Sequence, residues 1–177
     1  MLWAADLTHV ASWSGFVCVA FAIDAHARRV GGWRASGSAA AGFVLDALEQ
    51  AIHQRRPAKG AGLVAHSDRG GQCLATRDTE RLAEAGIAPS AGSGGDSYDN
   101  ALAEAFNSLF KAELVRNRGP WKGIDDLEIA VAEYIDWFNH RRLHGELGLV
   151  PPVEYEATHH QAHPAPATVG ASLQSLH

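Results

Sequence analysis

Three acids, Asp6, Asp68 and Glu104, are the residues of this 177-residue chain that best suit metal-assisted chemistry. Mg²⁺ prefers carboxylate oxygens and water as ligands, so acids that converge in space can hold a pair of hard divalent cations. Two such ions about 4 Å apart stabilise both the attacking and the leaving oxygen of an in-line phosphoryl displacement. If the fold brings these acids together, phosphodiester chemistry on a nucleic acid is the leading hypothesis.

The spacing of the acids carries little weight by itself, because most of the 20 acidic residues should be solvated. Asp68 and Glu104 are nevertheless the only Asp-then-Glu pair at a separation of 36 positions. The residues around the acids are more specific. They form four stretches in a fixed order along the chain, which read ADLT, HSDRG, GDSYDNALAE and WFNHRRLH.

These linked motifs resemble the catalytic core of bacterial insertion-sequence transposases of the orfA/orfB group, among the DDE transposases and retroviral integrases. The resemblance runs from about residue 3 to about residue 157 and implies a ribonuclease H-like fold. It makes Asp6, Asp68 and Glu104 the catalytic triad, which would bind two Mg²⁺ or Mn²⁺ ions. The implied activity is DNA strand cleavage at the element's end, followed by strand transfer during DNA transposition.

The resemblance also implies DNA contacts from the helix that carries Glu104. Lys111 matches the basic residue two turns after the glutamate, and a separation of seven residues puts both side chains on one helix face. Asn100 lies one turn before Glu104, where it orients the glutamate, contacts the substrate or caps the helix.

A late basic motif contains Arg141, Arg142 and His144. By the resemblance, these residues either contact DNA or hold the last helix in place. His66 either supports the metal ligands or is a packed histidine. The implied partners are the transposon ends, the target DNA and further copies of the chain on that DNA.

The composition limits the class of protein. A net charge of −5 argues against strong non-specific DNA binding, because Lys and Arg supply most of that affinity. No run of 18 apolar residues appears, so we expect no membrane span. Two cysteines favour a cytoplasmic chain with reduced thiols. The resemblance further implies a bacterial protein that is associated with the nucleoid through its DNA. No Cys/His group has the spacing of a zinc site.

The residue pattern alone predicts an α/β fold with a mixed five-stranded sheet flanked by helices. A mobile loop over 91–98 precedes the helix of Glu104, which Asp99 or Asn100 can cap. Asp125 and Glu128 resemble a capping box for the final helix. We expect a core over 1–157 and a disordered tail over 158–177. The remaining expected elements are strands over 3–10, 16–23, 29–34, 63–66 and 87–90 and helices over 39–55 and 76–85.

Relatives in this group carry helix-turn-helix segments before the core, whereas this chain begins five residues before Asp6. We therefore expect a fragment, a truncated copy or one half of a split product. The alternative function is an inactive transposase remnant that acts only as a DNA-binding or dimerisation module. A ribonuclease H-like nuclease would share the metal chemistry but not the flanking motifs.

Overall fold

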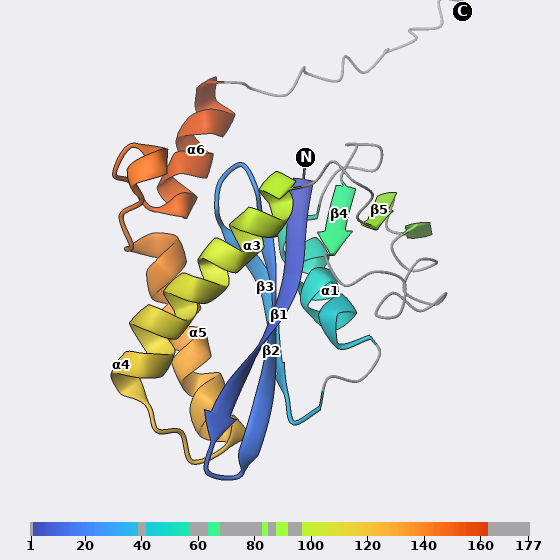
Figure 1. The fold of residues 1–177 in the computed structure, drawn as a ribbon. Coiled ribbons are helices and arrows are strands. Elements are labelled where there is room, and N and C mark those ends of the chain that lie inside the picture. The colour runs from blue at the N-terminus through green and yellow to red at the C-terminus, as the bar shows by residue number, and fades with distance from the viewer. Residues whose placement is uncertain are drawn as a thin grey trace, which may run out of the picture.

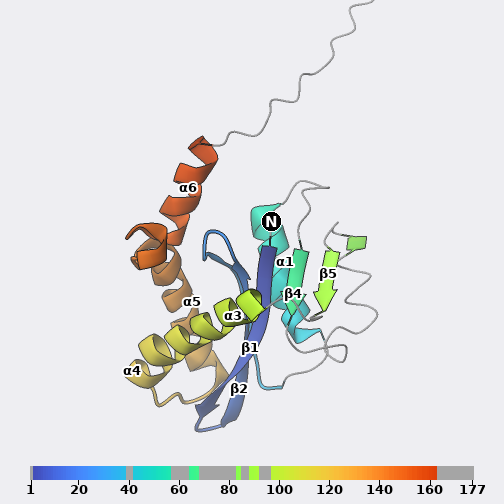
Figure 2. The same cartoon turned by 45° about the horizontal axis from the view of Figure 1, so that its top comes forward.

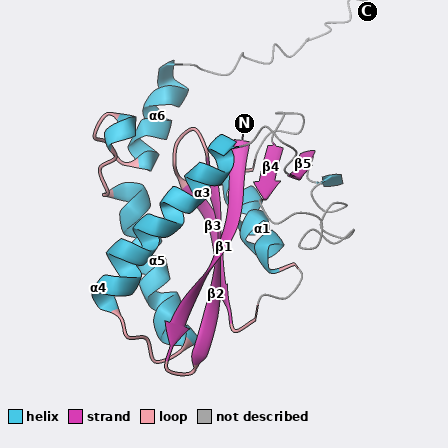
Figure 3. Ribbon diagram, viewed as in Figure 1, coloured by secondary structure: helices cyan, strands magenta, loops and turns pink. Residues whose placement is uncertain are grey.

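The computed structural model of the chain describes residues 2–38, 42–56, 64–67, 83–84, 88–91 and 97–162. Three strands open the described chain, two more strands follow the first helix, and the remaining elements are helical. Helices flank both faces of one sheet (Figure 3). The expected mixed α/β class is confirmed. No helix in the described ranges is both long and apolar enough to cross a membrane.

The sheet has five strands in the order β3-β2-β1-β4-β5 (Figure 1). β1 (Leu2–Ser12), β2 (Gly15–Asp24) and β3 (Val30–Ser36) form an antiparallel meander. On the other side of β1, β4 (Val64–Ser67) and β5 (Ala88–Ala91) pair in parallel. The long first strand therefore lies in the middle of the sheet.

The second strand is buried on both faces, as its continuous apolar run predicts. Val19 and Phe21 belong to the larger core, which lies under the helices of one face. Ala20 and Ala22 belong to smaller clusters with α1 (Phe43–Arg55), on the opposite face. Small side chains on the α1 face let that helix lie close to the sheet.

The closest approach of α1 to the sheet is at Gly32 on β3. A Cβ atom at this position would lie 2.0 Å from the carbonyl oxygen of Ala47 and 2.8 Å from the backbone nitrogen of Ala51. Only glycine leaves room for the helix backbone here, because both clashing atoms belong to the main chain.

The helices α3 (Ser97–Phe110) and α5 (Ile124–His140) cover the other face of the sheet (Figure 2). The helix α3 continues through a π-helical turn η1 (Lys111–Val115) into the short α4 (Arg116–Arg118). Phe106 of α3 packs edge-to-face on the ring of Phe21 at 4.8 Å and on that of Phe138 at 5.0 Å. Such pairs favour a fixed separation between helix and sheet.

The start of α3 differs from the expectation. Asp99 and Asn100 lie inside the helix, which already begins at Ser97, so neither residue is its cap. The predicted loop over 91–98 is wrong at Ala91, which ends β5, and at Ser97 and Tyr98, which are helical. Residues 92–96 lie outside the described ranges. Of the expected helix over 76–85, the structure describes residues 83–84, which are helical.

The capping box predicted at the start of α5 is wrong. Gly123 is the N-cap, and no side chain caps the helix. Because the helix begins directly after this glycine, Asp125 and Glu128 are already within its first turns. The carboxylate of Asp126 instead accepts a hydrogen bond from the backbone N–H of Lys122 at 3.1 Å.

The helix α5 is not the last one, since a 3₁₀ turn η2 (Gly145–Leu147) leads to α6 (Pro152–Ala162). Residues 158–162 are therefore helical, although they were expected in the tail, and residues 163–177 lie outside the described ranges. Glu156 anchors α6 through ion pairs with Arg29, at 2.7 Å, and with Arg55.

Candidate active site

Asp6 lies halfway along the central strand, where it pairs with Phe21 of β2 and is half-buried. One carboxylate oxygen accepts the backbone N–H of Leu7 at 2.8 Å. The other accepts the side-chain amide N–H of Asn107 on α3 at 2.7 Å. These two hydrogen bonds fix the orientation of the carboxylate.

Glu104 lies one helical turn before Asn107, and its side chain is exposed. Leu102 and Phe106 on the same helix are buried in the core, so α3 has one apolar and one polar side. The contact between Asn107 and Asp6 turns the polar side toward β1. Glu104 and Asn107 are neighbours on the surface of α3, because they lie three residues apart on the helix.

Asn107 is the residue that the sequence analysis missed. Its Nδ2 donates to Asp6, while its Oδ1 is buried and has no hydrogen-bond partner among the described residues. Native proteins pair nearly all buried polar atoms with a protein group or a water. The available signal was the position of Asn107, three residues after Glu104 on a helix.

Asp68 lies outside the described residues, but the strand before it is described. β4 runs parallel to β1, and its last residue, Ser67, pairs with Ala5. Within the described ranges, no three Asp, Glu, His or Cys side chains are grouped so that they could hold a metal ion. The expected triad is complete only with Asp68.

Two further predicted residues lie in described elements, although their side chains are not described. His66 is the third residue of β4, and Asn100 lies in the first turns of α3. Lys111 is described in full and is exposed. It begins the π-helical turn that continues the helix of Glu104. Such turns within helices are frequent at functional sites.

Arg142 of the late motif lies in an ion pair with Glu113 of η1. Its Nη2 and Nε donate to Glu113 Oε1 at 2.7 and 3.0 Å. Tyr134 Oη donates to the other oxygen of the same carboxylate at 2.9 Å. The guanidinium is thus engaged between α5 and η1, which favours the second of its two expected roles, holding the helix.

The charges of this cluster shift its pKa values. Burial alone would raise the pKa of Glu113, but the hydrogen bonds from Arg142 and Tyr134 outweigh it and hold that pKa below its ordinary value. The hydrogen bond to Glu113 raises the pKa of Arg142. Burial and the bond to Glu113 raise that of Tyr134. The ion pair therefore stays charged at neutral pH.

His144 is buried beside this cluster, with its ring edge-to-face on Phe138 at 4.7 Å. Burial and the nearby charge of Arg142 lower the pKa of His144, so the ring is neutral at pH 7. A neutral, buried ring packs well but supplies no positive charge for a phosphate. The structure thus gives His144 a packing role.

The remaining polar residues of the late motif divide between core and surface. Asn139 is buried and binds the backbone of Val30 twice, accepting from its N–H at 3.0 Å and donating to its carbonyl at 2.9 Å. These bonds tie α5 to the edge strand β3. Arg141 is exposed and pairs with the exposed Asp136 at 2.7 Å. Exposed pairs of this kind contribute little to stability, so Arg141 can exchange partners.

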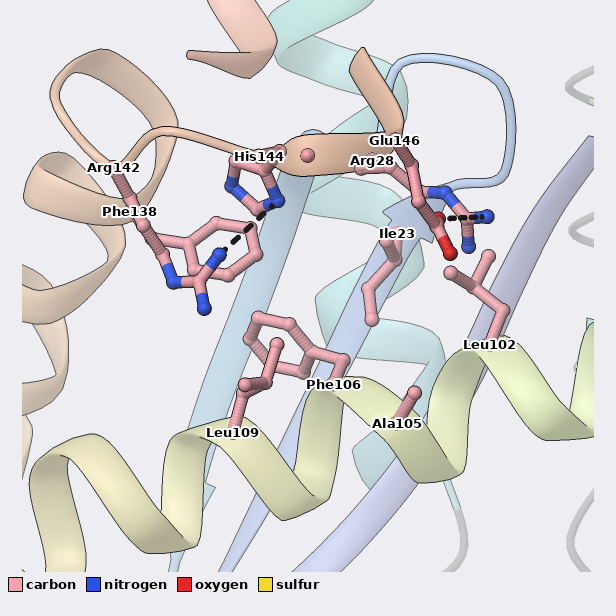
Figure 4. Close-up of a pocket in the computed structure, with 11 residues that line it drawn as sticks. Ile23, Arg28, Leu102, Ala105, Phe106, Leu109, Phe138, Arg142, His144 and Glu146 are labelled. Carbon is pink, nitrogen blue, oxygen red and sulfur yellow. Dashed lines mark hydrogen bonds and ion pairs between the residues drawn. The ribbon is translucent and has the colours of Figure 1, made fainter. Parts of the chain in front are cut away.

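A pocket of about 220 Å³ lies between α3, the end of α5 and η2 (Figure 4). Leu102, Phe106 and Leu109 project into it from α3, toward Arg142 and His144. These α3 residues lie on the side of the helix opposite to Glu104 and Asn107 at 3.6 residues per turn. The pocket is therefore separate from the candidate active site.

Two models for the integrase core domain match the chain, one over residues 1–97 and the other over residues 85–152. The "Putative transposase for insertion sequence element IS986/IS6110" of Mycobacterium tuberculosis (strain CDC 1551 / Oshkosh) is 52% identical over 169 residues, 94% of this chain and 61% of the relative. The transposase for insertion sequence element IS629 of Shigella sonnei is 50% identical, over 90% of this chain and 52% of the relative. The chain thus spans about half to three fifths of the length of these two relatives.

Solved structures show the same fold at low identity. The catalytic core domain of BIV integrase superposes with a TM-score of 0.66 at 21% identity, covering 91% of this chain and 97% of that one. The catalytic core domain of HTLV-2 integrase, in complex with magnesium, gives 0.65 at 18% identity, covering 87% and 94%. The expected ribonuclease H-like architecture is confirmed. The chain belongs to the integrase core domain family.

Proposed function

We propose that this chain is the catalytic core of a DDE transposase, which cleaves DNA strands and transfers them during transposition. The observation that carries the proposal is the contact between Asp6 and Asn107, because it turns the Glu104 side of α3 toward the central strand. The transposase relatives support the same reaction.

Asp68 is the third acid in this proposal. Ala5 on β1 and Ser67, the last residue of β4, are paired. Asp6 is the next residue along β1, and Asp68 follows Ser67 in the sequence. The carboxyl ends of neighbouring parallel strands are common places for ligand-binding groups. The proposal therefore assigns one acid to each of β1, the end of β4 and α3.

The described residues fit a site for Mg²⁺ or Mn²⁺. Asp6 offers an oriented carboxylate and Glu104 an exposed one, which are the hard oxygen ligands that these cations prefer. The unpartnered Oδ1 of Asn107 adds a buried acceptor beside them. When bound, two such ions would supply an activated water and stabilise the charge on the phosphoryl group.

The chain's own residues hold the reacting groups in place. Asp6 is fixed by two hydrogen bonds, and the packing of Phe106 on the sheet fixes the helix of Glu104. Preorganised groups of this kind lower the barrier because no reorganisation is needed during the reaction. In cleavage, a water oxygen bonds to phosphorus while the 3′ oxygen leaves. In transfer, that 3′-hydroxyl attacks a target phosphodiester, so each step exchanges one P–O bond for another.

We assign DNA contact to Lys111, Asn100 and Arg141. Lys111 and Arg141 are exposed, and Lys111 shares a continuous helical run with Glu104. Arg142, also expected at the DNA, is assigned instead to the ion pair with Glu113 that holds α5. The partners proposed are transposon ends, target DNA and further copies of the chain on DNA.

An assay with end-labelled oligonucleotides and Mg²⁺ or Mn²⁺ tests the proposal. Joined products that depend on the cation would support a transferase. Cleaved products without joining would indicate a nuclease of the same fold. A gel shift without products would favour the alternative, a remnant that only binds DNA. The variant Asp6→Asn is the control, since it keeps the size of the side chain but removes its charge.

A further inference from the structure

We infer that Asn107 is a positioning residue of the metal site, which orients Asp6 through its amide nitrogen and receives a hydrogen bond from the hydration shell of the bound cation through its amide oxygen. The inference rests on the proposed function, because it assumes that a divalent cation binds at Asp6. Asn107 contacts Asp6 from α3 through its side-chain amide.

The contact with Asp6 fixes which way the amide of Asn107 points. A charged carboxylate has no hydrogen to donate, so the NH₂ group must face Asp6 Oδ2, at 2.7 Å. The amide oxygen then faces away from that carboxylate oxygen. The backbone N–H of Leu7 occupies one site on Asp6 Oδ1 at 2.8 Å. A carboxylate oxygen has two acceptor sites, so one hydrogen bond does not prevent it from coordinating a cation.

The amide oxygen of Asn107 lacks a donor. It is buried, and no described residue donates a hydrogen bond to it. Buried acceptors in native proteins nearly always have a protein or water partner. Water coordinated to Mg²⁺ or Mn²⁺ is a strong donor, and these cations usually retain several waters when bound by carboxylates. A cation at Asp6 would therefore supply the partner that this oxygen lacks.

The position of Asn107 on the helix links the two acids. It lies three residues after Glu104, so both side chains project from neighbouring positions on one helix side. An asparagine at this place can orient Asp6 without adding a charge, whereas an acid would repel it. Replacing a residue that supports a metal ligand in this way typically changes the affinity for the metal by roughly 10- to 100-fold. We expect a change of about that size when Asn107 is replaced.

Titration of the full 177-residue chain with Mn²⁺ in the absence of DNA, followed by the electron paramagnetic resonance signal of free Mn²⁺, tests the inference. Asn107→Leu removes donor and acceptor but keeps the size of the side chain. Asn117→Leu is the matched control, because Asn117 is an exposed asparagine further along the same helical run. Thermal unfolding without metal shows whether either variant disturbs the fold.

We expect Asn107→Leu to weaken Mn²⁺ binding by about tenfold or more, while its metal-free unfolding midpoint stays close to that of the unchanged chain. Asn117→Leu should bind Mn²⁺ normally. Equal affinities for Asn107→Leu and the unchanged chain would overturn the role of Asn107 and leave the proposed function standing. The role of Asn107 would also be overturned if Asn107→Leu had a lower metal-free midpoint and both variants lost affinity for Mn²⁺. If the unchanged chain binds no Mn²⁺, the proposed function fails and this inference fails with it.

Discussion

The side-chain amide of Asn107 on α3 donates a hydrogen bond to the carboxylate of Asp6 on β1 at 2.7 Å, across 101 positions of sequence. This bond joins the central strand to the helix that carries Glu104. The bond therefore connects Asp6 with the helix that carries a second acid of the candidate site. The predictions below follow from that arrangement and from the ion pair that holds α5.

Glu104→Gln should reduce DNA strand cleavage by more than about 100-fold. Changing a residue that only supports a metal ligand costs up to about 100-fold, and the loss of a ligand itself should cost more. The substitution keeps the shape of the side chain and removes its charge. Glu104 is exposed, so the free energy of unfolding should change by less than about 0.5 kcal/mol. Cleavage kinetics and thermal unfolding measure the two effects. Near-normal cleavage would remove Glu104 from the active site.

Lys111→Ala should weaken DNA binding and reduce the slope of log affinity against log salt by about 0.9, the value for one lost phosphate contact. Stability should not change, because the lysine is exposed. Titrations of one duplex at several salt concentrations measure the slope. Lys122→Ala is the control, since Lys122 is exposed but lies before α5, away from the Glu104 helix. If both variants give the slope of the unchanged chain, Lys111 is an ordinary surface lysine.

Arg142→Met should lower the free energy of unfolding by about 2 kcal/mol, as expected for loss of hydrogen bonds to a partly buried charge. The variant leaves Glu113 with only Tyr134 as its side-chain partner in the described cluster. The salt slope of DNA binding should stay the same. Arg141→Met is the comparison, and it should unfold normally because its pair with Asp136 is exposed. A stable Arg142→Met with a reduced slope would return Arg142 to the DNA surface.

The sequence pattern was sufficient to predict the elements whose buried side follows from the spacing of their own apolar residues. The apolar run of β2 predicted a strand buried on both faces, and the periodicity of Leu102 and Phe106 predicted the buried side of α3. In such elements the spacing of apolar residues determines which side faces the core. Strand ends differed by one or two residues, since pairing with a neighbour decides where a strand stops.

Long-range polar contacts could not be predicted in the same way. Asn139 binds the backbone of Val30, 109 positions away, and Glu156 binds Arg55, 101 positions away. No local pattern distinguishes such residues from solvated ones. The helix α6 was not predicted at all for this reason, because ion pairs to distant residues anchor it. The role of Asn107 was missed because its partner, Asp6, lies on another element.

The stability of the chain should fall as pH decreases from about 7 to 5, and His144 should contribute to that fall. Burial lowers the folded-state pKa of His144 below its ordinary value of 6.5. The unfolded chain therefore takes up the proton first, so the contribution of the neutral ring is fully present above pH 6.5 and is lost as the pH falls toward the folded-state pKa. Glu113 contributes to pH dependence only in more acid solution, because its pKa lies below 4.5.

His144→Phe keeps an aromatic ring on Phe138 and removes the titrating group. Between about pH 7 and 5, the free energy of unfolding should fall less for the variant than for the unchanged chain. The reason is that the variant takes up as much as about one proton fewer when it unfolds. Urea unfolding at several pH values measures this difference. His53→Gln, at an exposed position of α1, is the control. An identical pH profile for His144→Phe would contradict the lowered pKa.

Anomalous diffraction from a crystal of the full chain soaked in Mn²⁺ tests the central claim most directly. We predict a Mn²⁺ ion bound by carboxylate oxygens of Asp6 and Asp68, with metal–oxygen distances of about 2.0–2.2 Å, and with Glu104 on the same side of the sheet. The amide oxygen of Asn107 should then lie within hydrogen-bond distance of a water on that ion. Absence of Mn²⁺ from Asp6 at saturating concentration, or Asp68 or Glu104 on the opposite side of the sheet, would contradict a DDE active site in this chain.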